Sequence, residues 1–369
     1  MNTPPQSLLL LGIGGGGAVL VRGILRAFGS GIRTLILDTD AQSGGNGDVP
    51  FALLGGNRLA GRGTGGQPAA ARAAFQDNPA LLDTALEGVR TVVIVTALGG
   101  GTGGGTTGEL LKHLHTLGIV TLIFATLPFA FEGDERRRAA QTAAGPIEQN
   151  ADVSVFLPLD DLVAESGTDN MREALAHGLE TIAAGVTLFW RVLEKPGYIR
   201  FDAERLRATL SACGRGHFAT AVAQGPDRVQ HVLASLAANR LLARSESSPP
   251  VRSILVGVLA GDDLRLSELN MIVCGLTAAF GADVNIELGT VNDEDTFSGR
   301  LAVVALVFEQ SATAAHPAKA AEGHPARKLT GEHAALAGNG RFQRAEKTIW
   351  NDEDLDIPTY LRRSLSLDR

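Results

Sequence analysis

The first part of the chain alternates between short apolar runs and longer segments with helical spacing. The apolar runs are bounded by glycine or proline and predict buried strands at Leu8–Gly12, Thr34–Leu37, Thr91–Ala97, Val120–Thr126 and Val153–Pro158. Between them, helical spacing of apolar residues predicts helices at Ala18–Ala27, Pro79–Leu86 and Thr107–Leu117. Strands that alternate with helices are typical of a mostly parallel sheet covered on both faces. We therefore predict an α/β fold here.

The pattern changes after residue 169. Helical spacing runs without a break from Asn170 to Leu193 and stops at Lys195-Pro196-Gly197. Beyond this long helix, helices are predicted at Ala203–Ala212, Asp227–Leu242 and Arg265–Ala279, and strands at Ser253–Ala260, Ala282–Thr290 and Arg300–Glu309. The hairpin-like spacing of these strands favours an α+β second domain.

Strand and helix patterns end near residue 310. Residues 311–350 almost lack large apolar side chains, so that burial cannot offset chain entropy, and they predict a flexible, disordered linker. Residues 351–369 again carry patterned apolar and charged side chains, which is typical of a terminal binding peptide. The predicted divisions are a first domain at 1–169, a central helix at 170–195, a second domain at 196–310, the linker at 311–350 and the peptide at 351–369.

Composition narrows the class of protein. The chain has 369 residues, of which 44% are hydrophobic and 20% charged, as in ordinary globular proteins. A net charge of −7 argues against nucleic acid as a partner. Cys213 and Cys274 show no metal or disulfide spacing, so no metal site is predicted. The apolar run Leu8–Leu11 is too short for a signal peptide core or a membrane span, which predicts a cytoplasmic protein without direct membrane insertion.

Two glycine-rich segments follow predicted strands and open predicted helices: Gly12–Ala18 and Leu98–Thr107. Glycines at such a turn let backbone N–H groups close on phosphate, and the helix N-terminus adds its dipole. Neither segment continues into Gly-Lys-Ser/Thr, which excludes a Walker-type P-loop. Two loops at the carboxyl ends of strands in one sheet predict a site that clamps one polyphosphate from both sides.

The first loop alone leaves alternatives. A glycine-rich turn without any ligand is one, and the dinucleotide turn of an oxidoreductase is another. An oxidoreductase leaves Gly99–Thr107 and the terminal peptide unexplained, and its expected acid after the second strand could only be Asp38.

As a set, the motifs resemble those of the tubulin/FtsZ family. Gly99–Gly105 is similar to the signature GGGTGTG, with Gly104 in place of the second threonine. Further motifs follow in the family's order: Asp38–Gln42 resembles NTDAQ, Gly63–Pro68 resembles GAGANP, Pro128–Gly133 with Arg136 resembles PFxFEGxxR, and Asp356–Arg363 resembles the terminal peptide DIPxFLR. The resemblance covers nearly the whole chain and points to an FtsZ-type protein, either the main division protein or a divergent second copy.

The resemblance implies a Rossmann-type, parallel-sheet GTPase domain, a long central helix and an α+β second domain. It implies GTP or GDP as the ligand, with Mg²⁺ held by water or phosphate. Glu132 would hold the ribose and Arg136 the phosphate side of the pocket, with a surface ion pair as the alternative for both. The residues implied in nucleotide binding are Gly14, Gly15, Gly16, Gly17, Ala18, Thr64, Gly101, Thr102, Gly103, Glu132, Arg136 and Glu180.

The chain departs from the family where guanine is held. On the central helix the family has an aromatic ring, an Asn and an Asp, and the matching positions here are Leu175, Leu179 and Glu180. In a separate departure, Val19 stands where the family usually has Asn beside the first phosphate loop, and we expect Val19 to lie on the buried face of the first helix, with one hydrogen bond lost. The Glu180 carboxylate can still accept hydrogen bonds from guanine N1 and N2, unless it is simply a solvated helix residue. We expect guanine binding with weaker discrimination against other bases.

A second departure lies in the loop after the central helix, which in the family reads NxDxxD and enters the next subunit's nucleotide pocket. Asp202 matches the first Asp, whereas Arg200 and Arg205 replace the Asn and the last Asp, and Glu204 lies one residue early. A guanidinium cannot accept a proton, so we expect Asp202 and Glu204 to be the catalytic residues and hydrolysis to be slow. The alternatives are Asp202 as a helix cap and the arginines as γ-phosphate charge stabilisers.

The resemblance also implies partners. Copies of the chain would assemble head to tail into filaments at the division site and hydrolyse GTP at the subunit interface; the alternative is a GTP-binding filament with little or no hydrolysis. Residues 351–369 would bind a membrane adaptor similar to FtsA or ZipA, using Leu355, Ile357, Tyr360 and Leu361.

Overall fold

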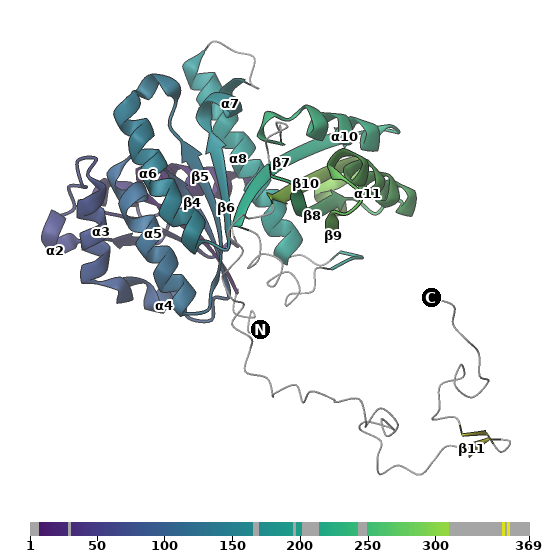
Figure 1. Ribbon diagram of the computed structural model, residues 1–369, viewed down its shortest axis with the longest axis horizontal. Helices are drawn as coiled ribbons and strands as arrows, with labels where there is room; N and C mark the ends of the chain where they lie inside the picture. The colour runs from purple at the N-terminus through teal and green to yellow at the C-terminus, as the bar shows by residue number, and fades with distance from the viewer. Residues whose placement is uncertain are drawn as a thin grey trace. The chain divides into compact units, whose positions relative to one another are not determined.

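The computed structural model describes residues 7–28, 31–164, 170–194, 197–200, 214–242 and 249–309, and the short pieces 349–350 and 353–354. The chain divides into two compact units, Met1–Ala318 and Lys319–Arg369 (Figure 1). In the second unit, β11 (Ile349–Trp350) pairs antiparallel with β12 (Glu353–Asp354). Most of the predicted linker and terminal peptide lies outside the described residues, and both stay predictions.

The first unit is built on a ten-stranded sheet in the order β3-β2-β1-β4-β5-β6-β7-β10-β8-β9. Its first six strands are all parallel: β1 (Leu8–Ile13), β2 (Thr34–Asp38), β3 (Phe51–Leu53), β4 (Thr91–Ala97), β5 (Val120–Leu127) and β6 (Val153–Pro158). The five predicted strands are confirmed nearly residue for residue, because strands buried on both faces read as continuous apolar runs. The short β3 is half-buried, and its composition did not predict it.

Helices cover both faces of these strands. Alternate residues of β1 show this: Leu8 and Leu10 belong to one buried cluster and Leu9 and Leu11 to another. The first cluster lies under α1 (Gly14–Phe28), α7 (Leu159–Ala164) and α8 (Met171–Glu194). The second lies under α3 (Pro68–Asp77), α4 (Asp83–Leu86), α5 (Gly101–Thr116) and α6 (Asp134–Asn150), near the short α2 (Gly56–Leu59). The predicted α/β layers are therefore present.

The sheet continues into the second half of the unit. Strand β7 (Gly214–Gln224) pairs parallel with β6, and β10 (Arg300–Glu309) lies antiparallel between β7 and β8 (Val251–Ala260). Strand β9 (Asn285–Asn292) pairs parallel with β8 across α11 (Leu266–Phe280). The predicted spacing suggested hairpins, but β9 and β10 follow each other along the chain without pairing. The remaining described elements are α10 (Arg228–Ala238), α12 (Glu294–Phe297) and the 3₁₀ turns η1 (Ala41–Gly44), η2 (Pro79–Leu82), η3 (Ala130–Glu132) and η4 (Arg240–Leu242).

A buried ion cluster joins α10 to α11. The Arg228 side chain donates to both carboxylate oxygens of Glu268, at 2.7 and 2.9 Å, and to Asp263 at 2.6 Å. Arg228 is 4% and Glu268 7% exposed. Hydrogen bonds from Arg228 hold the pKa of the Glu268 carboxyl below its usual range, against the effect of burial. The cluster therefore fixes α10 on α11 in the charged state.

No helix in the described parts of the chain is both long and apolar enough to cross a membrane.

Candidate functional site

At the first glycine loop, no residue separates the strand from the helix: β1 ends at Ile13 and α1 begins at Gly14. Gly14 has φ 73°, a left-handed conformation that favours glycine. A Cβ atom added at Gly17 would lie 2.6 Å from the carbonyl oxygen of Val95 on β4. Gly15 is exposed, whereas Gly17 and Ala18 are buried. The loop backbone is therefore pressed against β4 while its tip faces solvent.

The second glycine loop lies directly beside the first. It follows β4 and opens α5 at Gly101. A Cβ atom at Gly14 would lie 3.3 Å from the backbone nitrogen of Gly103, and the Thr96 hydroxyl donates to the carbonyl of Ile13 at 3.1 Å. The N-termini of α1 and α5 thus meet at the carboxyl edge of the sheet. This is the juxtaposition that the two motifs predicted.

The end of β2 supports both loops. The hydroxyls of Thr39 and Thr102 share a buried hydrogen bond of 2.7 Å. Asp38, 2% exposed, accepts hydrogen bonds from the Thr39 backbone N–H and the Ser43 hydroxyl, at 2.7 and 2.5 Å. Both carboxylate oxygens of Asp38 are therefore engaged by nearby groups of the chain, the Thr39 backbone and the Ser43 side chain. An oxidoreductase would need this carboxylate to face a ribose, so the geometry counts against that alternative.

Thr64 lies against the start of α5. A Cβ atom at Gly101 would contact the Thr64 hydroxyl and would lie 2.9 Å from the backbone nitrogen of Gln67. Gly65 and Gly66, between them, have φ 59° and 83° and so lie in the left-handed region. The structure therefore places Thr64, one of the residues implied in nucleotide binding, beside the second glycine loop.

Glu132 and Arg136 are joined by an ion pair beside the same loop. Arg136 Nη1 donates to Glu132 Oε2, and Glu132 Oε1 accepts from the backbone N–H of Phe129 at 3.0 Å. A Cβ atom at Gly99 would lie 3.1 Å from the carbonyl oxygen of Arg136. The ion pair named as the alternative is thus present, and the start of the Arg136 side chain and its backbone border the second glycine loop.

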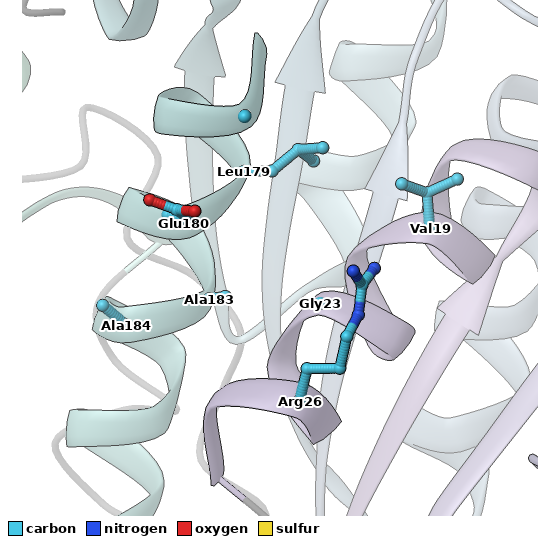
Figure 2. Close-up of a pocket in the computed structure, with 8 residues that line it drawn as sticks. Val19, Gly23, Arg26, Leu179, Glu180, Ala183 and Ala184 are labelled. Atoms are coloured by element: carbon cyan, nitrogen blue, oxygen red, sulfur yellow. The ribbon is translucent and has the colours of Figure 1, made fainter. Parts of the chain in front are cut away.

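Beside the first loop, a pocket of about 510 Å³ opens between α1 and α8 (Figure 2). One wall is formed by α1 and the other by α8. The lining residues are Val19, Gly23 and Arg26 of α1 and Ala176, Leu179, Glu180, Ala183 and Ala184 of α8. Leu179 and Glu180, two of the three positions that the sequence singled out for the base, therefore line one pocket, and the third, Leu175, is not among its lining residues. Val19 lines the same pocket and is 47% exposed, so the prediction that it lies on the buried face of α1 is wrong. The pocket adjoins the glycine loops because Val19 lies two residues after Gly17.

Arg26 was missed by the motif comparison. It lies three residues after Gly23 and seven after Val19, which places all three on one face of α1. That helical spacing is the signal that could have found it.

The predicted catalytic residues Asp202 and Glu204 lie outside the described residues. The segment that precedes them is anchored on β9, because Ile199 N–H donates to the Thr290 hydroxyl at 2.9 Å and Thr290 N–H donates to the Ile199 carbonyl at 2.8 Å. Tyr198 is 71% exposed, and Arg200 is exposed too.

Comparison with known proteins bears directly on this arrangement. The GTPase domain of the Tubulin/FtsZ family matches residues 7–166. The cell division protein FtsZ of Pseudomonas putida KT2440 is 29% identical over 367 residues, covering 98% of this chain and 91% of that protein. The cell division protein FtsZ of Pseudomonas aeruginosa PAO1 is 28% identical over 355 residues, covering 96% and 88%.

Solved structures show the same fold. An FtsZ dimer from M. jannaschii superposes with a TM-score of 0.74 at 23% identity, covering 82% of this chain and 88% of that one. A GTPγS-bound protofilament of CetZ2 from Haloferax volcanii gives 0.68 at 21% identity, covering 83% and 95%. The predicted tubulin/FtsZ-like fold is confirmed. Residues 7–166, which hold both glycine loops, match the family's GTPase domain, and the chain shares the fold of the solved FtsZ and CetZ structures.

Proposed function

We propose that this protein binds a guanine nucleotide at the edge formed by its two glycine loops, assembles head to tail into filaments, and hydrolyses GTP at the interface between subunits. The observation that carries the proposal is the direct packing of Gly14 against Gly103, which sets the N-termini of α1 and α5 at one place. Two helix N-termini with free backbone N–H groups make a strong site for a polyphosphate.

The residues at the site fit a nucleotide. The exposed tip at Gly15 and the open position at Gly100, where an added Cβ would meet no atom within 4 Å, leave room for phosphate oxygens. Glu132 and Arg136 border the second loop and would reach the ribose and a phosphate. The pocket between α1 and α8 would take the base. Mg²⁺, when bound by the phosphates, would neutralise part of their charge.

Hydrolysis would need groups from a second copy of the chain. In the proposed filament, Asp202 and Glu204 of one subunit approach the γ-phosphate held by the next and orient the attacking water. Support comes from the anchoring of Gly197–Arg200 on β9, which gives the following residues a fixed starting point. The CetZ2 protofilament, a structural neighbour, is itself bound to GTPγS.

Phosphate release measured at increasing protein concentration tests this function. We expect turnover per molecule to rise steeply above a threshold concentration with GTP and to stay low with ATP, because the active centre is complete only in the filament. Asp202→Ala is expected to lower turnover at least tenfold while filaments still form in electron micrographs. Turnover per molecule that is independent of protein concentration would contradict a centre shared between subunits.

The second candidate is a filament that binds GTP with little or no hydrolysis. The exposed Arg200 favours it, since a guanidinium stands where the family supplies a hydrogen-bond acceptor. In that case assembled protein releases no phosphate, and Asp202→Ala changes nothing.

The terminal peptide is proposed to recruit the filament to a membrane adaptor similar to FtsA or ZipA, at the division site. Deleting residues 351–369 is expected to abolish binding to adaptor-coated vesicles and to leave GTP-dependent sedimentation within twofold of the full chain. The reason is that the two glycine loops and the pocket lie far earlier in the chain and need no residue of the peptide. Loss of sedimentation in the truncated protein would contradict this division of roles.

A further inference from the structure

The pocket between α1 and α8 carries two opposite charges on an otherwise apolar lining. Glu180 projects from α8 and Arg26 from α1, and the other six lining residues have no polar side-chain atoms (Figure 2). Both charged residues are exposed at the pocket. Their presence is informative because a purely apolar slot would bind any base.

Arg26 is held in a defined orientation. Its Nε donates to the backbone carbonyl of Arg22, one turn earlier on α1, at 3.2 Å. The side chain therefore runs back along the helix, and its guanidinium points toward Val19 (Figure 2). This hydrogen bond uses Nε alone, so the two terminal nitrogens, Nη1 and Nη2, take no part in it.

Gly23 keeps the space between the two helices open. The position lies on the same face of α1, between Val19 and Arg26, and an added Cβ there would meet only Ala183 of α8, at 4.0 Å. A longer side chain at Gly23 would extend toward α8 and occupy part of the pocket.

Arg26 and Glu180 do not neutralise each other. No hydrogen bond or ion pair within 4.0 Å joins these two described side chains, although they line one pocket. A carboxylate and a guanidinium kept apart across a pocket present an acceptor on one wall and a fork of donors on the other.

Guanine matches this pair of walls. Its N1 and N2 groups are donors that suit a carboxylate, and its O6 and N7 atoms are acceptors that suit a forked guanidinium. Adenine has an amino group in place of O6 and an acceptor at N1. It would therefore place a donor against the guanidinium and an acceptor against the carboxylate, and both contacts would be unfavourable. We propose that Arg26 is a specificity-determining residue that binds O6 and N7 of guanine opposite Glu180. This assignment rests on the proposed nucleotide function.

Competition against a fluorescent GDP on the full chain tests the assignment, with GDP, 7-deaza-GDP, inosine diphosphate and ADP as competitors. We expect the wild type to prefer GDP about tenfold over 7-deaza-GDP, which lacks the N7 acceptor. Arg26→Ala, and Arg26→Lys, which keeps the charge but not the fork, are expected to bind both equally. Glu180→Gln is expected to lose the preference for GDP over inosine diphosphate, which lacks the N2 amino group, and to keep the preference for N7.

Arg72→Ala is the matched control, since it removes an exposed arginine from α3 outside the pocket. It is expected to keep the wild-type ratios. A GDP to 7-deaza-GDP ratio that is near one in the wild type, or unchanged in both Arg26 variants, would overturn the role of Arg26 and leave the nucleotide function standing. A wild type that binds no GDP at all would instead overturn the proposed function, and the assignment with it.

Discussion

Arg228→Ala is expected to lower the free energy of unfolding by about 3–5 kcal/mol, the usual cost of removing one partner from a buried ion pair. The substitution removes the two hydrogen bonds that Arg228 donates to the Glu268 carboxylate, 7% exposed, and leaves it only the one from the Arg265 backbone N–H at 2.9 Å. Asp263, whose side chain is 49% exposed, can return to water and contributes little to this cost. Urea unfolding followed by circular dichroism measures the change.

The surface pair Arg58–Asp77 provides the control. Its side chains are 51% and 52% exposed, so Arg58→Ala is expected to lower the free energy of unfolding much less than Arg228→Ala does. The double variant Arg228→Met with Glu268→Leu is expected to recover much of the lost stability, because no buried charge remains. An equal effect of Arg228→Ala and Arg58→Ala would contradict the role given to the buried cluster.

The same cluster predicts a dependence on pH. Because the pKa of Glu268 is lowered in the folded chain, its contribution is complete above the carboxyl's ordinary pKa of about 4.3 and is lost as the pH falls through the lower folded value. The stability difference between wild type and Arg228→Ala should therefore shrink in acid. A difference that grows in acid would contradict this assignment.

Gly103→Ala is expected to weaken guanine nucleotide binding by about ten- to a hundredfold. The new methyl group would lie 2.7 Å from the Thr96 hydroxyl and would contact the carbonyl of Ala97, both at the end of β4, so it would push the start of α5, with the second glycine loop, away from β4. Overpacking of this kind costs about 1–3 kcal/mol, and here the strain falls on the backbone that would hold phosphate. Titration with a fluorescent guanine nucleotide measures the loss.

Gly104→Ala is the matched control on the next residue of α5. An added Cβ there would lie 3.5 Å from the Cβ of Ala143, an ordinary contact, and alanine favours the helix by about 0.5–1 kcal/mol. We expect unchanged binding and slightly higher stability. Equal losses in the two variants would show that the crowding at Gly103 is not what sets the loop geometry.

The sequence predicted the parallel half of the fold because its strands are buried on both faces. It did not predict β7, whose sequence GRGHFATAVAQ is rich in small and polar residues and gains its strand structure by pairing with β6 and β10. Nor did it predict α6, where Ala140, Ala143 and Ile147 are the buried residues of a strongly polar helix. Tertiary contacts decide such segments, and local pattern cannot register them.

The candidate site shows the same division. Motif spacing was sufficient to predict that Gly14, Thr102 and Gly103 lie close together, since both loops follow strands of one parallel sheet. It did not find Arg26: helical spacing places Arg26 on the same face of α1 as Val19, but only the structure shows that this face lies opposite α8 across the pocket. The crowding at Gly103 and the ordinary contact at Gly104 are likewise properties of packing. They agree with the family signature, which has glycine at the position of Gly103 and threonine at the position of Gly104.

Sedimentation of the purified full chain with Mg²⁺ and GTP, GDP or ATP, over a range of protein concentrations, tests the central claim most directly. A nucleotide clamped between the two glycine loops, with its γ-phosphate at a subunit interface, predicts that protein pellets above a threshold concentration with GTP and stays in the supernatant with GDP or ATP. Protein that remains monomeric with GTP at every concentration, or that pellets equally with all three nucleotides, would contradict the account.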